Sequence, residues 1–274
     1  MQMIKNTLRV GVETPFTFLV MSDAHLCETD AAETEERRAF ANDRKNAFSY
    51  SLRFLDEVRA YVAETGYPLF NTGDMLDFIT PENLRVARDF AEATGMVMAA
   101  GNHEYWHCPK NRFSFDDVPE TYENKNASLA AVEADLGMDI RFSCREIGGV
   151  NFVCVDDGDY DIDEDVFEKL LKVEAEGKPI LLFMHIPLYS AHLGDSAKYS
   201  LCAPDAYFEN CHPVDVFERK PEAPTVPMVE HIRRSALIKC VLSGHTHKNT
   251  EILGLGEKDQ IVTGLDTLRE ITVI

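Results

Sequence analysis

The chain has 274 residues, of which 45% are hydrophobic, and its formal net charge at pH 7 is −20. A chain of this length can bury one substantial core, and we treat residues 1–274 as a single domain. The acidic charge argues against a nucleic-acid surface and against anionic membranes, because both are polyanions that need a basic face on the protein.

No segment of the sequence predicts a membrane span or a secretory signal. The apolar runs FTFLVM and PILLFM are far shorter than the roughly 20 residues that cross a bilayer, and residues 1–16 lack an apolar core. The seven cysteines are scattered without a CxxC pair. This favours reduced thiols over a disulfide framework, and we expect a cytoplasmic protein.

Short apolar runs alternate with longer amphipathic runs from residue 16 onward. The short runs predict strands at 16–21, 67–70, 96–100, 150–155, 179–184 and 238–242, with closing strands within 250–255, 259–264 and 268–274. Helical spacing and helix-end signals predict helices at 41–64, 81–95, 126–137, 163–176 and 226–237. The alternation predicts an α/β fold with a largely parallel sheet, or two packed sheets.

Two segments interrupt this alternation. Residues 104–125 are aromatic and irregular, and residues 187–225 contain several prolines and no clear period. Loops of this length inside a compact domain are usually functional or disordered, and the aromatic residues argue against disorder. We interpret both segments as caps over a site.

Five of the predicted strands end in residues that can bind metal ions. These residues are Asp23, His25, Asp74, Asn102, His103, His185, His245 and His247. Ligands bind at the carboxyl ends of strands in open α/β sheets, so we expect these side chains to meet. Turn preferences explain single Asp or Asn residues at strand ends, but not five histidines in such places.

The residue types indicate the kind of metal site. Oxygen and imidazole donors without thiolate favour Mn, Fe, Zn or Ni. The donors outnumber the four that one tetrahedral zinc ion needs, and two ions bridged by one carboxylate would use them all. Two divalent ions about 3.5–4 Å apart can clamp phosphate oxygens and lower the pKa of a shared water that attacks phosphorus. They would also supply positive charge that this acidic protein otherwise lacks.

Five motifs, in their order and rough spacing, resemble those of the calcineurin-like metallophosphoesterases: DAH (23–25), GDMLD (73–77), GNHE (101–104), MHIP (184–187) and GHTH (244–247). The resemblance implies a two-sheet β-sandwich flanked by helices, with two metal ions at the sheet ends. It implies one ion held by Asp23, His25, Asp74 and His247, and another held by Asp74, Asn102, His185 and His245, so that Asp74 bridges. It also implies that His103 lies near the leaving group without binding metal, and that Asp77 orients His103.

The expected function is a dimetal phosphoesterase that cleaves a small phosphomonoester or phosphodiester by attack of a metal-bridging hydroxide. The motifs do not separate the two ester classes or fix the oligomeric state. A Ser/Thr protein phosphatase is an alternative, but Phe78 replaces the arginine expected to grip phosphate in that group. A catalytically silent metal-binding module is another, although such a module should have lost ligands or His103. The net charge counts against a nuclease.

The acidic stretch DGDYDIDEDVFE (157–168) resembles a calcium-binding loop. Ile162, however, stands where the sharp turn of such a loop needs glycine, because a β-branched residue resists positive φ. We predict instead a solvated loop between a strand and a helix.

Overall fold

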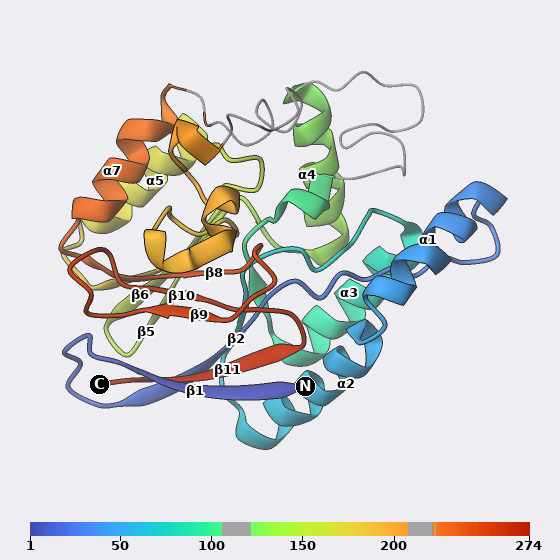
Figure 1. The fold of residues 1–274 in the computed structure, drawn as a ribbon. Coiled ribbons are helices and arrows are strands. Elements are labelled where there is room, and N and C mark those ends of the chain that lie inside the picture. The colour runs from blue at the N-terminus through green and yellow to red at the C-terminus, as the bar shows by residue number, and fades with distance from the viewer. Residues whose placement is uncertain (106–121, 208–220, 222) are drawn as a thin grey trace.

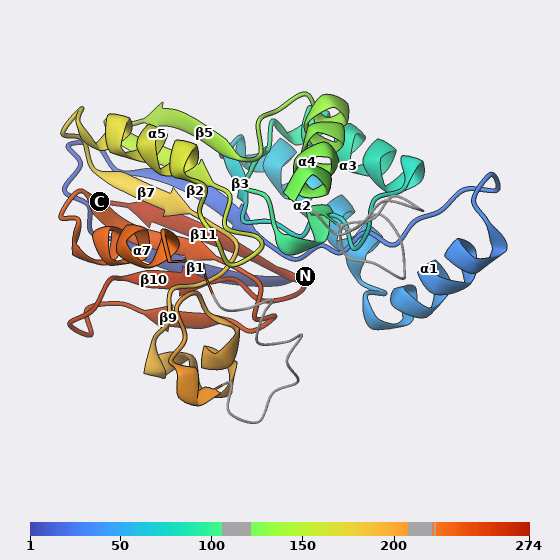
Figure 2. The same ribbon diagram turned by 90° about the horizontal axis from the view of Figure 1, so that it is seen from above.

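The computed structural model describes residues 1–105, 122–207, 221 and 223–274. Within these ranges two β-sheets pack face to face, and helices cover both outer faces (Figures 1 and 2). The predicted architecture, a two-sheet α/β sandwich flanked by helices, is therefore confirmed.

The first sheet has five strands in the order β1-β11-β2-β3-β4. The strands are β1 (Gln2–Leu8), β2 (Phe16–Met21), β3 (Leu69–Asn71), β4 (Val97–Met98) and β11 (Thr267–Val273). Strands β2, β3 and β4 run parallel, whereas β11 is antiparallel to β2. Strand β1 was not predicted, because all but one of its residues are exposed or only partly buried and no strong apolar pattern marks it.

The second sheet has six strands in the order β5-β6-β7-β8-β10-β9. They are β5 (Phe142–Ile147), β6 (Val150–Val155), β7 (Ile180–Phe183), β8 (Ile238–Ser243), β9 (Thr250–Ile252) and β10 (Gln260–Val262). Strands β6, β7 and β8 are parallel. Parallel pairing gathers the carboxyl ends of β6–β8 at one edge of this sheet, as it does for β2–β4 in the other.

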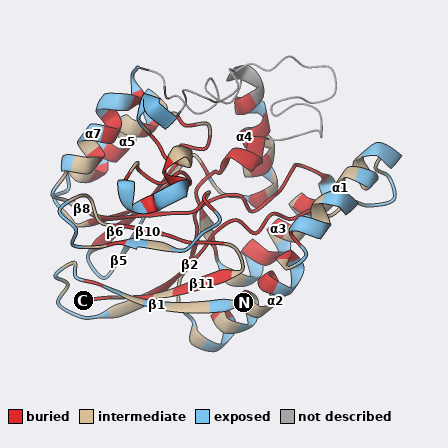
Figure 3. Cartoon of the chain, in the orientation of Figure 1, coloured by how far each residue is buried: buried red, intermediate tan, exposed pale blue. Residues whose placement is uncertain are grey.

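Alternation along the strands builds two layers of core. Phe18 and Val20 of β2 face the second sheet, while Leu19 and Met21 face the helices. Between the sheets the Phe70 ring lies 4.6 Å from Phe183, centroid to centroid. Buried residues follow the strands and the inner faces of the helices (Figure 3).

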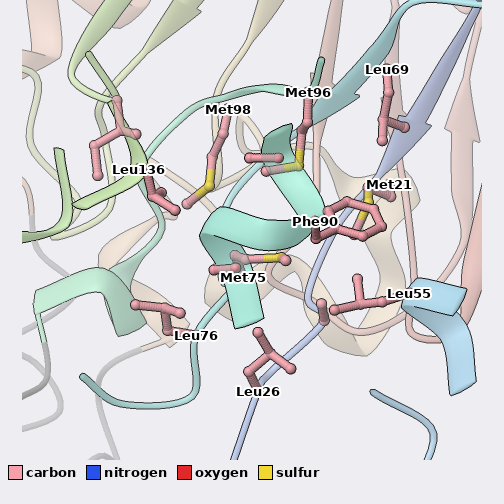
Figure 4. Close-up of a cluster of buried hydrophobic side chains, with 14 of the residues drawn as sticks. Met21, Leu26, Leu55, Leu69, Met75, Leu76, Phe90, Met96, Met98 and Leu136 are labelled. Atoms are coloured by element: carbon pink, nitrogen blue, oxygen red, sulfur yellow. The ribbon is translucent and has the colours of Figure 1, made fainter. Parts of the chain in front are cut away.

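Three helices cover the outer face of the first sheet: α2 (Ser51–Thr65), α3 (Pro81–Thr94) and α4 (Tyr122–Leu136). Their side chains, among them Leu55 and Phe90, pack with Met21 and Met98 (Figure 4). Helices α5 (Glu164–Glu174) and α7 (Thr225–Arg234) cover the outer face of the second sheet.

The predicted helix at 41–64 is two helices, which corrects the sequence interpretation. Helix α1 (Glu35–Ala47) ends just before Phe48, and α2 begins at Ser51. The break turns two aromatic side chains inward: the Phe48 ring stacks on His25, and the Tyr50 hydroxyl donates to the carbonyl oxygen of Asp23. Apolar spacing continues through the break, so periodicity alone could not detect it.

The two predicted caps are partly outside the described residues, at 106–121, 208–220 and 222. The described part of the second cap contains two 3-10 helices, η2 (Ala191–Tyr199) and η3 (Asp205–Tyr207), and the first cap begins in η1 (Asn102–Tyr105). No helix among the described residues is long and apolar enough to span a membrane. The five described cysteines are free thiols.

Candidate metal centre

The predicted site residues follow strand ends in both sheets and converge between them. Asp23 and His25 follow β2, Asp74 follows β3, and Asn102 and His103 follow β4 in the first sheet. His185 follows β7, and His245 and His247 follow β8 in the second. Their side chains meet across the sandwich, so strands from both sheets contribute to one site.

One group of donors surrounds Asp23. The Nε2 atoms of His25 and His247 lie 3.0 Å apart, and Asp23 Oδ1 lies 3.4 Å from His247 Nε2 and 3.7 Å from His25 Nε2. Asp23 and His25 are fully buried, whereas His247 is exposed. This arrangement leaves the group open to solvent on the His247 side.

A second group of donors surrounds His185. Its Nε2 atom lies 3.2 Å from Asn102 Oδ1, 3.1 Å from His245 Nδ1 and 3.2 Å from Asp74 Oδ2. The same Oδ2 atom of Asp74 lies 3.7 Å from His25 Nε2 in the first group. Asp74 is thus the carboxylate that both groups share.

The outward-facing ring nitrogens are held by protein groups. His25 Nδ1 lies 3.0 Å from Asp77 Oδ1, and His185 Nδ1 lies 2.9 Å from the carbonyl oxygen of Thr72. An N–H at each Nδ1 leaves the Nε2 lone pair facing the cluster, which is the tautomer a metal ligand needs. The donor set and its tautomers therefore fit bound divalent cations.

The backbone at the site is strained. Five of the converging residues have positive φ, between 48° and 65°: Asp23, His25, Asp74, His245 and His247. Non-glycine residues rarely adopt this conformation, and it persists where the surrounding structure imposes it, most often at functional sites. Here the positive φ values occur where the chain turns these side chains toward the cluster immediately after each strand.

Two glycines let the strand ends approach closely. A Cβ atom at Gly101 would lie 2.3 Å from Asp74 Oδ1, and one at Gly244 would lie 1.8 Å from Ser22 Oγ and 2.4 Å from Asp23 Oδ2. Any side chain at either position would displace a carboxylate of the cluster.

A family model for calcineurin-like phosphoesterases matches residues 16–249, most of the chain. The chain belongs to the calcineurin-like phosphoesterases. This membership supports a metal-dependent hydrolase, and the His/Asp groups fit a dinuclear metal centre. No curated protein matches the sequence.

Solved structures share the fold of this phosphoesterase at low sequence identity. A purple acid phosphatase from yellow lupin (Lupinus luteus) seeds matches with a TM-score of 0.53 and 13% identity, covering 92% of this chain and 44% of that one. A putative 5'-nucleotidase from Staphylococcus aureus matches with a TM-score of 0.51 and 11% identity, covering 94% of this chain and 51% of that one. The present chain thus spans about half the length of these structures.

Charge interactions in the metal-free phosphoesterase shift the pKa values of the cluster. Burial lowers the pKa of His25 and His185, but the neighbouring aspartates outweigh burial and raise these values to about 9 and about 10. Burial raises the pKa of Asp74, yet the surrounding histidines hold it below its usual range. Protons on the two histidines thus balance carboxylate charge when metal is absent.

His103 lies beside Asp77, which the family resemblance predicts as its orienting partner. His103 Nδ1 lies 2.7 Å from the backbone carbonyl oxygen of Asp77 and 3.3 Å from its Oδ1. The Asp77 carboxylate lies closer to His25, at 3.0 Å. Burial lowers the pKa of His103 to about 4, despite the nearby Asp74. The backbone carbonyl, rather than the carboxylate, makes the shorter contact to His103.

Sequence reasoning missed several residues around the cluster. The Glu104 carboxylate accepts from the backbone N–H groups of Asp74, Leu76 and Gly101, and burial raises its pKa to about 8. Its place in the GNHE motif was a signal for this role. Arg44 binds Asp77 from helix α1 and carried no signal, since no motif surrounds it.

The prediction of a solvated loop at 157–168 is wrong for the first residues of that segment. Asp157 is fully buried, and its carboxylate accepts from the backbone N–H groups of His185 and Ile186. Burial raises the pKa of Asp157 to about 8. Tyr160 is buried as well and contacts His245. The signal was that Asp157 follows β6, another strand with a parallel neighbour.

Proposed function

We propose that this protein is a dimetal phosphoesterase for small phosphate esters, with the metal ions held by the two donor groups described above. The first ion would be held by Asp23, His25, Asp74 and His247, and the second by Asp74, Asn102, His185 and His245. The single observation that carries this assignment is that Asp74 Oδ2 lies within 3.7 Å of a histidine nitrogen in each group.

The proposed chemistry follows from these positions. Two divalent ions held here supply positive charge to the phosphoryl oxygens and lower the pKa of a water molecule that attacks phosphorus. The exposed edge at His247 leaves the cluster accessible to an ester. His103 is fixed at Nδ1 by the Asp77 carbonyl, and it lies at the edge of His25 with ring centroids 4.7 Å apart. From there, Nε2 of a protonated His103 would donate a proton to the departing oxygen; burial disfavours this charged form, and the negative charge of a bound phosphate would favour it.

Metal identity, ester class and location are part of the proposal. Imidazole and carboxylate donors favour Mn, Fe, Zn or Ni. Either a phosphomonoester or a phosphodiester fits the same donor set. The fold likeness to a putative 5'-nucleotidase motivates nucleoside monophosphates as one class of candidate substrates. We place the enzyme in the cytoplasm, because its scattered cysteines fit reduced thiols better than a disulfide framework.

A Ser/Thr protein phosphatase is less well supported. Phe78 occupies the position where that group has a phosphate-binding arginine, and here Phe78 is 2% exposed and packs against Phe40 at 5.3 Å between ring centroids. A catalytically silent module is also less well supported, because every proposed ligand position holds Asp, Asn or His and because His103 is present.

The test is hydrolysis by protein stripped of metal and reloaded separately with Mn²⁺, Fe²⁺, Zn²⁺ or Ni²⁺. The substrates are p-nitrophenyl phosphate, bis(p-nitrophenyl) phosphate and nucleoside monophosphates, with Asp74→Asn as control. We expect turnover that falls more than about 100-fold in Asp74→Asn, since even indirect partners of metal ligands cost about 10–100-fold. Metal binding without turnover of any ester would favour the silent module instead.

A further inference from the structure

Arg44 makes a two-pronged contact with a buried carboxylate beside the cluster. It lies in the last turn of α1, and its Nε and Nη2 atoms donate to Asp77 Oδ2 and Oδ1, each at 2.6 Å. The Asp77 side chain is fully buried, whereas that of Arg44 is 28% exposed. Among the described residues, no other Lys or Arg forms an ion pair with Asp77.

The same turn of helix reaches His25 by a second route. Phe48 lies four residues after Arg44, which is the spacing of neighbours on one helix face. Its ring stacks on His25 with centroids 4.1 Å apart and an interplanar angle of 12°. The guanidinium carbon of Arg44 lies 4.9 Å from the centroid of the Phe48 ring. Arg44 thus contacts both groups that hold His25: the acceptor at Nδ1 and the stacked ring.

Physical chemistry gives these contacts a consequence. Without the guanidinium fork, the buried Asp77 carboxylate is no longer fixed at both oxygens and can rotate toward other donors. His25 would then lose a fixed acceptor at Nδ1, and its Nε2 lone pair would no longer be held toward Asp23 and Asp74. A guanidinium fork matches a carboxylate in a way that a lysine ammonium cannot, because only the fork fixes both oxygens.

We propose that Arg44 is a positioning residue of the metal centre, which acts through Asp77 and Phe48 to orient His25. This inference rests on the proposed role of His25 as a metal ligand. Arg44 lies outside all five sequence motifs, on a helix that contributes no donor to the cluster. The affinity of one of the two metal positions therefore depends on how the end of α1 docks.

The experiment is calorimetric titration of metal-free protein with Mn²⁺. Arg44→Met should weaken one of two binding equivalents about 10–100-fold and leave the other unchanged, as loss of an outer partner does at other metal sites. Arg44→Lys should restore part of the affinity. Lys45→Met is the matched control, because Lys45 is the next residue and pairs at 2.6 Å with Glu28, which is not among the donors of the cluster. It should titrate like the wild type.

A double-mutant cycle tests whether Arg44 acts through Asp77. In an Asp77→Asn background, Arg44→Met should lower the Mn²⁺ affinity by clearly less than it does in the wild-type background, because only the contact with the Phe48 ring is then lost. If the losses of Mn²⁺ affinity caused by Arg44→Met and Asp77→Asn were fully additive, the proposal would be overturned. It would also be overturned if both Mn²⁺ equivalents bound with wild-type affinity in Arg44→Met and in Arg44→Lys.

The outcomes also separate this proposal from the proposed function. Wild-type protein that binds fewer than two equivalents would overturn the metal assignment and the Arg44 inference together. If the wild type binds two Mn²⁺ equivalents and substitution of Arg44 weakens neither, only the Arg44 inference is overturned. Weakened binding in Arg44→Met, with a wild type that turns over no ester, would support the inference and overturn the phosphoesterase mechanism.

Discussion

The Tyr160 hydroxyl lies 2.7 Å from Nε2 of His245, on the side of the ring that faces away from the cluster. Tyr160 follows β6 and His245 follows β8, so β7 lies between their strands in the second sheet. His245 Nδ1 faces Asn102 and His185. With a cation at Nδ1, the Nε2 proton would be donated to the Tyr160 oxygen, which would fix the ring and its tautomer.

Tyr160→Phe removes that acceptor and keeps the ring. We expect the affinity of one Mn²⁺ equivalent to fall about 10–100-fold in calorimetric titration. Tyr61→Phe is the control, because the Tyr61 hydroxyl donates to Glu270, a residue of β11 that is not among the donors of the cluster. Equal titration curves for both variants and the wild type would show that Tyr160 does not support His245.

His103→Gln tests the proposed proton donor. The backbone N–H of His103, which donates to Asp74 Oδ1 at 2.9 Å, is retained in the variant. Both metal equivalents should therefore bind normally, while kcat falls about 10²–10⁴-fold. The loss should be larger for phenyl phosphate than for p-nitrophenyl phosphate, because a poorer leaving group needs the proton more. An equal loss on both esters would argue that His103 acts in another way.

The metal-free protein should lose stability as pH rises from about 7 to 10. The folded pKa values of His25 and His185 are raised to about 9 and about 10 by aspartates that outweigh burial, and burial raises that of Glu104 to about 8. A group whose pKa is raised in the folded state stabilises the fold at low pH, and this contribution is lost as the pH rises through the folded pKa. Groups whose folded pKa is lowered, such as His103, change the stability at pH values below this range.

We expect a fall in Tm of about 5 °C across that range, since a chain of this size shifts by about 2–4 °C per kcal/mol. The measurement is circular dichroism melting in EDTA. Mn²⁺-loaded protein is the control, because metal replaces the protons on His25 and His185 while the net charge repulsion of the surface remains. A metal-free Tm that is constant, or falls no more than the loaded one, would contradict these shifts.

The aromatic layer beneath the site should carry much of the stability. Phe70 is fully buried between the sheets, with ring centroids 4.6 Å from Phe183 and 4.9 Å from Phe152. Phe70→Ala should lower the free energy of unfolding by about 3–5 kcal/mol in urea titration. Leu52→Ala, at a side chain that is 45% exposed, should change it by no more than about 0.5 kcal/mol. Similar losses in both variants would contradict this account of the core.

Much of the fold could be predicted, because apolar periods report directly on burial. The parallel strands and the helices α3, α5 and α7 lie within a few residues of their expected positions. The break between α1 and α2 could not be predicted, because Phe48 and Tyr50 leave the helix for partners that follow β2. Strand β1 also lacked a signal, since its pairing with β11 joins opposite ends of the chain.

The sequence by itself determined that Asp, Asn and His residues follow strand ends, because strand and turn preferences are local. Only the tertiary structure decided that Asp74 lies beside both His25 and His185, because that placement depends on how two sheets pack. It also decided which groups surround them: Arg44 lies 33 residues before Asp77, and Tyr160 lies 85 residues before His245. Contacts over such separations leave no local sequence pattern, since they arise from packing between elements that are far apart in the chain.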